Sequence, residues 1–235
     1  MSRTECVTNS ISMCELRDSC RFAEKFMAFC RECRNYGANW ACPPFDFDVP
    51  EYLDRYDRCC VFGVKMNHDE AVLARIKTSE QAAAYSAEIF KTVKDKLLAL
   101  LFHLEEKFPG SVGASAGGCS FCGPCARSEG TPCPTPGRVR YSLESLGFDV
   151  VTISEKLLGV KILWGRDSLP PYQTLVNALF FREGKNASPE AVKNETASTL
   201  ASIFPEGELE TAPRKIAMPS LKYGIPQSGK ERKRP

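Results

Sequence analysis

The strongest periodic pattern in the chain runs from Thr78 to Phe108. Apolar side chains recur there every three or four residues, which is the spacing of one face of an α-helix. Thr78 or Ser79 is suited to cap the first turn, and Pro109-Gly110 ends the pattern. This run therefore predicts a long helix over residues 78–108.

Shorter patterns predict the remaining elements. Phe22, Phe26 and Phe29 share one face of a short amphipathic helix that leads into Cys30. Further short helices are expected at residues 141–146, 151–158 and 189–204. Strands are expected at residues 59–66, 160–164 and 173–181, and residues 111–118 form a small-residue strand or extended segment. Residues 173–181 also have some helical spacing, but the neighbouring turn residues favour a strand.

Together these elements predict an α+β domain over residues 1–185, with a mixed or antiparallel sheet covered by the long helix. Two turn-rich, cysteine-bearing loops, at residues 30–50 and 119–137, are expected to lie together at one end of it. Residues 186–235 are expected to form a polar C-terminal extension that ends in a mobile tail from about residue 205.

Composition excludes several classes of protein. The longest apolar run, Leu97 to Phe102, has six residues, whereas a membrane span needs about 20. The polar N-terminus gives no sign of a secretory signal, so we expect a cytoplasmic protein without membrane association. The net charge of +2 indicates no nucleic acid or other charged partner, and the basic C-terminal end is expected to be a solvated tail.

Cysteine is the outlier, with 12 in 235 residues. Disulfides need an oxidising compartment, and a long, well-patterned core makes such crosslinks less necessary. Metal ligation fits a reducing cytosol because the thiolate is the form of cysteine that binds metal. The cysteine content therefore favours a metal site, and the spacing indicates which kind.

The second loop has the spacing of an iron–sulfur site. Cys119, Cys122 and Cys125 follow one another at intervals of three residues, and Cys133-Pro134 comes next. Such a triplet can bind three corners of one [4Fe–4S] cube, and bacterial ferredoxins place it before a Cys-Pro. Seven residues separate Cys125 from Cys133 here, so Cys133 is a ligand of either this cluster or another. A zinc ion held by four thiolates is the main alternative.

The first loop offers three more ligands: Cys30, Cys33 and Cys42. The candidates for a fourth are Cys20, Cys14, Cys133, Cys59 and Cys60, and Cys20 or Cys14 gives the simplest completion. A site with only three cysteines would leave one iron open, and an open iron is a Lewis acid able to bind a substrate. We favour interpreting the adjacent Cys59 and Cys60 as buried apolar residues at the start of a strand.

Other residues are weaker candidates. The only histidines are His68 and His103, and His103 is expected to be a surface or hydrogen-bonded residue of the long helix. Tyr36, Trp40 and Phe45 surround the first loop, where they either shield a cluster from water or simply pack in the core. The chain has no glycine-rich nucleotide motif and no motif for radical chemistry with adenosylmethionine.

The combined motifs resemble a family of cysteine-rich prokaryotic proteins described as predicted metal-binding proteins. The positions that carry the resemblance are Cys30, Cys33, Tyr36, Gly37, Trp40, Cys42, Pro43, Pro44, Cys119, Cys122, Cys125, Pro132, Cys133, Pro136, Ser142, Glu144, Gly147, Asp149 and Val150. The resemblance covers roughly residues 25–182 and implies metal binding. The family is commonest in anaerobes, consistent with oxygen-sensitive clusters. Cys6, Cys14 and Cys20 lie outside it and gain no support.

Three polar residues of that pattern have two interpretations. Glu144 is either a proton donor or cluster-facing group, or one of a set of turn residues in which Ser142 and Asp149 cap helices; we favour the second.

We therefore expect an iron–sulfur protein that uses one or two [4Fe–4S] clusters to transfer electrons to a partner enzyme. One alternative is a reductase or desulfurase with a three-cysteine cluster and an open iron. The other is a zinc-stabilised binding module.

Overall fold

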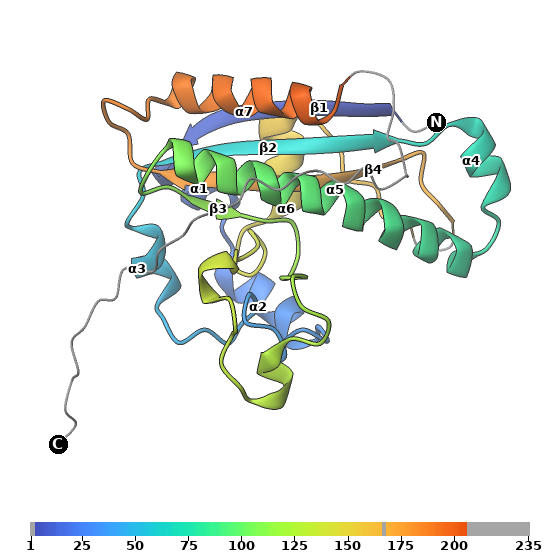
Figure 1. Ribbon diagram of the computed structural model, residues 1–235, viewed down its shortest axis with the longest axis horizontal. Coiled ribbons are helices and arrows are strands. Elements are labelled where there is room, and N and C mark those ends of the chain that lie inside the picture. Colours follow the sequence, from blue (N-terminus) through green and yellow to red (C-terminus); the bar gives the residue numbers. More distant parts are fainter. Residues whose placement is uncertain (1–2, 166–167, 206–235) are drawn as a thin grey trace.

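The computed structural model describes residues 3–165 and 168–205 (Figure 1). Its four strands form one sheet in the order β1-β2-β4-β3, and every neighbouring pair is antiparallel. The strands are β1 (Arg3–Ser12), β2 (Arg58–Asn67), β3 (Val112–Ala114) and β4 (Tyr172–Phe181). The sheet and the long helix confirm the predicted α+β class.

The sheet separates two hydrophobic cores. Successive side chains of a strand point to opposite faces, and on β2 this places Cys60 and Phe62 in one core and Cys59 and Val61 in the other. Both faces of β2 and β4 are therefore apolar. The prediction that Cys59 and Cys60 are buried strand residues is confirmed, since both are fully buried on β2.

Helices cover both faces of the sheet (Figure 1). The first core is covered by α5 (Ser79–Lys107) and α7 (Pro189–Ile203), and the second by α1 (Met13–Cys20) and α6 (Val150–Leu158). The Thr78 side chain accepts a hydrogen bond from the Gln81 amide while the Gln81 side chain bonds back, so α5 begins in a capping box where the sequence predicts a cap.

The remaining short elements are α2 (Ala23–Arg31), α3 (Val49–Leu53), α4 (Glu70–Arg75) and the 3₁₀ turns η1 (Ala126–Glu129) and η2 (Pro136–Arg138). Figure 1 shows α2 and the chain around η1 and η2 together beneath the sheet. We call residues 30–47 and 116–140 the cysteine lobe.

Two predicted elements are wrong. Residues 141–146 form consecutive turns instead of a helix, because the amides of Ser142 and Ser145 bond to each other's hydroxyls and compete with helical bonding. Residues 160–164 form no strand. Val160 follows the end of α6, and both its backbone groups are bonded to Ser154 of that helix, which leaves them unavailable for a sheet ladder.

The predicted helices at 22–29, 151–158 and 189–204 and the strands at 59–66 and 173–181 are confirmed by α2, α6, α7, β2 and β4. β1, α1, α3 and α4 are additions to the predicted set. The predicted tail lies almost wholly in residues 206–235, outside the described part. None of the helices in the described ranges has the length and apolar character needed to cross a membrane.

Candidate metal centre

Hydrogen bonds from side chains to backbone join the two cysteine loops. The Asn39 side chain donates to the carbonyl of Cys119 at 2.9 Å, and the Trp40 indole donates to the carbonyl of Thr131 at 3.1 Å. The guanidinium of Arg127 donates to the carbonyls of Asn39, at 3.1 Å, and Cys42, at 2.6 Å, and also to that of Pro44. The two loops therefore lie together at one end of the domain, as the sequence predicts.

The approach is closest where Gly118 faces Cys42. A methyl group built on Gly118 would lie 3.4 Å from the Cys42 sulfur and 3.4 Å from the Asn35 side-chain nitrogen. These distances are at the lower limit of ordinary van der Waals contact, so the backbone at Gly118 packs directly against the first loop with little room for a side chain.

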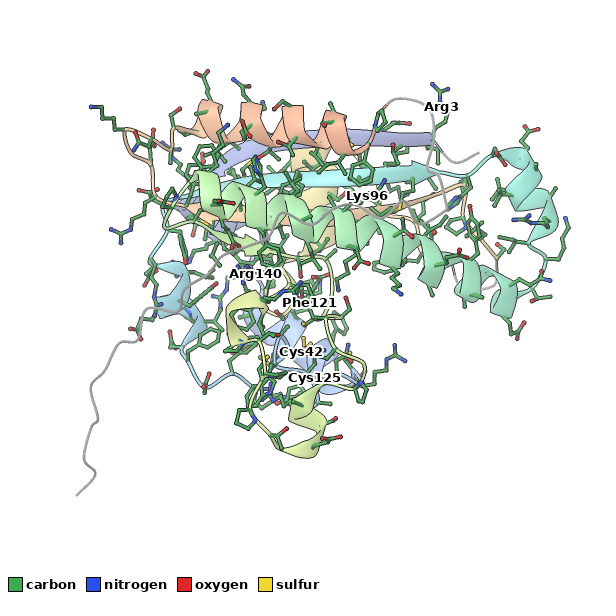
Figure 2. All side chains as sticks on the ribbon, in the orientation of Figure 1. Arg3, Cys42, Lys96, Phe121, Cys125 and Arg140 are labelled. Atoms are coloured by element: carbon green, nitrogen blue, oxygen red, sulfur yellow. The ribbon has the colours of Figure 1, made fainter. Side chains whose placement is uncertain are left out.

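The six loop cysteines form two groups of three. Cys30 and Cys33 act electrostatically on Cys42, and Cys122 and Cys125 act on Cys119. Cys33 and Cys122 are exposed, while the other four are half-buried. Figure 2 labels Cys42 and Cys125, one from each group, and shows both in the part of the molecule beneath the sheet. The structure thus brings the three predicted ligands of each loop near one another.

Burial makes three of the six thiols, those of Cys30, Cys42 and Cys119, hard to ionise without a metal. It raises the pKa of Cys42 to about 11, with Cys33 and Cys30 adding to the effect, and it also raises the pKa values of Cys30 and Cys119. A bound metal cation reverses this preference because it compensates the clustered thiolate charge. The donor set therefore fits a thiolate-binding metal.

Lys94 of α5 lies between the two groups. Its ammonium donates to the carbonyl of Gly118 and is attracted to Cys119 and Cys42. Burial lowers the pKa of Lys94, and the negative groups around it oppose that shift. This cation can offset part of the charge of metal-bound thiolates.

The candidate fourth ligands lie elsewhere. Cys20 is 1% exposed in the second core, Cys14 is exposed on α1, and Cys59 and Cys60 are buried on β2. Cys133 is half-buried in the wall of a cavity of about 500 Å³ beside Trp40 and Arg127. Ligation by Cys133 and by Cys20 stays a prediction.

Within residues 3–165 and 168–205, no three Cys, His, Asp or Glu side chains are grouped closely enough to hold a single metal ion. Four thiolates around one zinc ion stand about 3.8 Å apart, since each zinc–sulfur bond is about 2.3 Å. A [4Fe–4S] cube binds each thiolate through a different iron, which requires a wider spacing. The chemistry of six thiols suits either zinc or an iron–sulfur cluster.

The lobe is also anchored to α5. The Phe121 ring stacks on Phe102 with centroids 6.0 Å apart, and Arg140 forms an ion pair with Glu105 (Figure 2). Trp40 lies under the guanidinium of Arg127 at 4.9 Å. Phe45 instead packs with the aromatic residues of the second core, as one of the two predicted interpretations describes. Shielding of a cluster by Tyr36 or Trp40 stays a prediction.

The polar residues of the 142–149 segment separate into two roles. Asp149 caps α6, since its carboxylate accepts from the amides of Val151 and Thr152, as the sequence predicts. Glu144 instead faces Cys30 and Lys94 and lines a cavity of about 930 Å³. Burial raises the pKa of Glu144, and hydrogen bonds from its own backbone amide and from Ser142, with a smaller contribution from Lys94, oppose the shift. Whether Glu144 donates protons stays a prediction.

Sequence reasoning missed Lys94, Arg127 and Asn39. Arg127 and Asn39 lie within three residues of a loop cysteine, which is a weak signal for a residue that supports a metal site. Lys94 lies in the long helix, far from any cysteine in sequence, and no local pattern points to it.

Comparison with known proteins agrees with the donor set. A model of the family described as "Predicted metal-binding protein (DUF2284)" matches residues 16–177, which is more than half of the chain. No curated protein and no solved structure matches it.

Proposed function

The chain belongs to the family of predicted metal-binding proteins, and from this membership we propose that its cysteine lobe binds one or two [4Fe–4S] clusters. The observation that carries the proposal is the pair of cysteine triplets, Cys30, Cys33 and Cys42 with Cys119, Cys122 and Cys125, packed against each other through Gly118. Three thiols at such short intervals suit the corners of a cube better than the closed tetrahedron of one zinc ion.

The clusters would transfer single electrons to a partner enzyme. Cys33 and Cys122 are exposed, which supports clusters close to the surface, where a partner can approach. All twelve cysteines are free thiols, which supports a reducing compartment such as the cytoplasm.

A specific observation favours a second candidate, a reductase or desulfurase acting on a small molecule. The large cavity lined by Glu144 and Lys94 also contains Phe29 and Gly117, which lie just before Cys30 and Cys119. A three-cysteine cluster at the first loop would leave one iron open near this cavity.

The test is an anaerobic purification followed by iron, zinc and sulfide assays, a visible spectrum, and low-temperature EPR after dithionite reduction. Two clusters predict about eight irons and eight sulfides per chain, and one cluster predicts about four of each. Cys122→Ser and Cys33→Ser should each lose iron and sulfide. Cys6→Ser is the matched control, because Cys6 lies on β1 outside the lobe and is not a candidate ligand. A colourless protein with stoichiometric zinc would overturn the proposal.

A further inference from the structure

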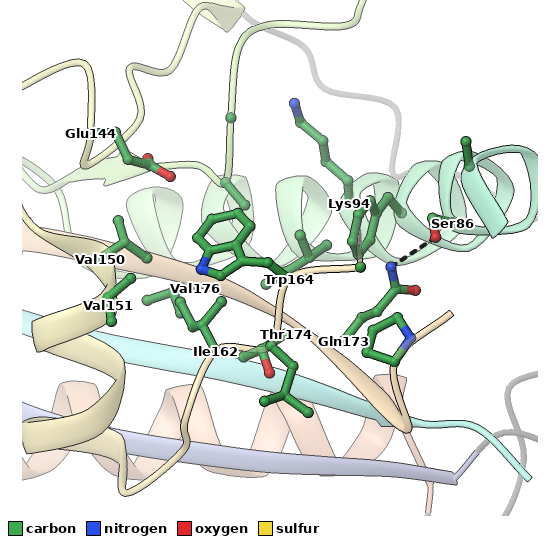
Figure 3. A pocket seen from close by; sticks show the side chains of 18 of the residues that line it. Ser86, Lys94, Glu144, Val150, Val151, Ile162, Trp164, Gln173, Thr174 and Val176 are labelled. Atoms are coloured by element: carbon green, nitrogen blue, oxygen red, sulfur yellow. Dashed lines mark hydrogen bonds between the residues drawn. The ribbon is translucent and has the colours of Figure 1, made fainter. Parts of the chain in front are cut away.

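The cavity of about 930 Å³ exists because the sheet is incomplete at one edge. β3 pairs only with Ala178–Phe180 of β4, and in the described chain no strand continues β3 beside the first half of β4. The chain instead leaves the sheet after Ala114 and runs towards Cys119. The exposed edge of β4, the first turns of α5, the start of α6 and residues 162–165 enclose the space that remains (Figure 3).

Most of the cavity wall is apolar. Two large aromatic side chains that line it are exposed to solvent. Trp164 is 73% exposed and Phe29 is 59% exposed, although both line the cavity. Figure 3 shows Trp164 reaching across the space, with Glu144 and Lys94 above it and Ile162 and Thr174 below it. Large aromatic residues exposed beside an apolar cavity are typical of a surface that buries them on binding.

Few polar groups face the cavity, and two of them have unused bonding capacity. The Thr174 hydroxyl is buried without a hydrogen-bond partner in the described part of the chain. Lys94 donates one hydrogen bond, to Gly118, whereas an ammonium has three donors. Lys25, by contrast, forms an ion pair with Asp149 at 3.6 Å. Glu144 faces Lys94, but no carboxylate of the described residues forms an ion pair with that lysine.

We propose that this cavity binds a small monocarboxylate with an apolar, aromatic body. Its carboxylate is received by Lys94 at the end of the cavity nearest the cysteine lobe, and its body lies between Trp164 and the apolar side chains of Val151 and Val176. A lysine ammonium and a carboxylate form a charge-assisted hydrogen bond, which is stronger than a neutral one. If the second proposed function is right, this carboxylate would also be the molecule that is reduced. Its binding does not depend on that function, so the binding proposal and the proposed function can fail separately.

The test is isothermal titration of the anaerobic, metal-loaded protein with 3-phenylpropanoate and with its neutral amide. We expect the acid to bind at least about tenfold more tightly than the amide, because only the acid is attracted by the charge of Lys94. Lys94→Met should weaken binding of the acid by at least about tenfold and leave binding of the amide nearly unchanged. Lys91→Met is the matched control, since Lys91 is exposed on the same helix outside the cavity.

A further variant keeps the test decisive if Lys94→Met disturbs the lobe, which the iron content of that variant will reveal. Trp164→Ala removes an exposed ring that lies against the body of the ligand, so it should weaken binding of the acid and of the amide alike. Equal affinity for acid and amide in the wild type, or unchanged binding in Trp164→Ala, would overturn the proposal. If the anaerobically purified protein contains no iron but binds the acid as expected, only the proposed iron–sulfur function is overturned.

Discussion

The sheet region and the cysteine lobe are held together by different forces. Strands β2 and β4 pair over ten residues each and carry fully buried side chains such as Phe62 and Phe180 on their faces. In the lobe, no residue from 116 to 140 is buried, and residues 30–47 bury only Asn39, Ala41 and Pro43. The lobe is ordered by hydrogen bonds to backbone carbonyls, chiefly from Arg127 and Asn39.

This difference teaches where metal binding contributes to stability. A region without a core gains little from the hydrophobic effect, so a bound metal supplies a large share of its folding free energy. The sheet region can be stable without metal because its two cores are complete. A change in one region should therefore leave the other region nearly unaffected.

Removing the metal should have the largest effect. After anaerobic chelation, we expect amides of residues 30–47 and 116–140 to exchange hydrogen at least about a hundredfold faster, because without the metal this coreless region keeps only a few hydrogen bonds and its contacts with α5. Amides of β2 and β4 should change by less than about threefold. Hydrogen exchange read by mass spectrometry measures both regions in one experiment. The Cys122→Ser protein without metal is the control, and chelator should not change it further. Equal loss of protection in both regions would show that they fold as one unit.

The converse prediction concerns the first core. Leu97 of α5 is fully buried against the sheet, so Leu97→Ala should lower the free energy of unfolding by about 2–5 kcal/mol through lost burial and a residual cavity. Urea unfolding followed by circular dichroism measures this change, and iron content without urea should stay at the wild-type value. Lys91→Ala on the exposed face should change stability by less than about 0.5 kcal/mol. Loss of iron in folded Leu97→Ala would contradict the separation of the two regions.

The same division explains which features the sequence could predict. The helix at 78–108 and the strand at 59–66 were predictable because burial imposes a periodic apolar pattern on them. β1 was missed because it is a half-buried edge strand. Polar residues such as Thr8, Asn9 and Ser10 leave its sequence without a regular alternation of apolar and polar positions. The cysteine triplets were predictable from spacing alone. Their partners Lys94 and Arg127 were not, because contacts between distant segments define their roles.

Arg127 tests the link between the two loops. Its guanidinium donates to three carbonyls of the first loop, a geometry that a lysine ammonium cannot reproduce. Arg127→Lys should therefore raise the local exchange rate of residues 39–44 by about ten- to a hundredfold, equivalent to about 1–3 kcal/mol. Arg138→Lys is the matched control in the same lobe, since Arg138 lies over the Phe121 ring at 4.1 Å and keeps a cation there as lysine. Unchanged exchange in Arg127→Lys would mean that the loops are held by other contacts.

The smallest predicted effect is a pH response confined to the sheet region. His68 is 7% exposed and its ring nitrogen lies 3.2 Å from the Gln173 side-chain oxygen. Burial lowers the pKa of His68, and the bond to Gln173 only partly opposes this. An unfolded chain binds the proton at its ordinary pKa of about 6.5, which is above the folded value. The contribution of His68 to stability is therefore complete above about pH 6.5 and is lost as pH falls below it, by at most about 1.4 kcal/mol per pH unit.

Urea unfolding between pH 7.5 and 5.5 should show this slope in the wild type and in His103→Gln, whose ring is about half exposed, but a flatter slope in His68→Gln. Hydrogen exchange of the lobe should not differ between His68→Gln and the wild type at any of these pH values, because the His68 ring contacts Gln173 and Tyr85 on the sheet side of the molecule. An equal dependence of the unfolding free energy on pH in all three proteins would show that groups other than His68 cause the loss of stability in acid.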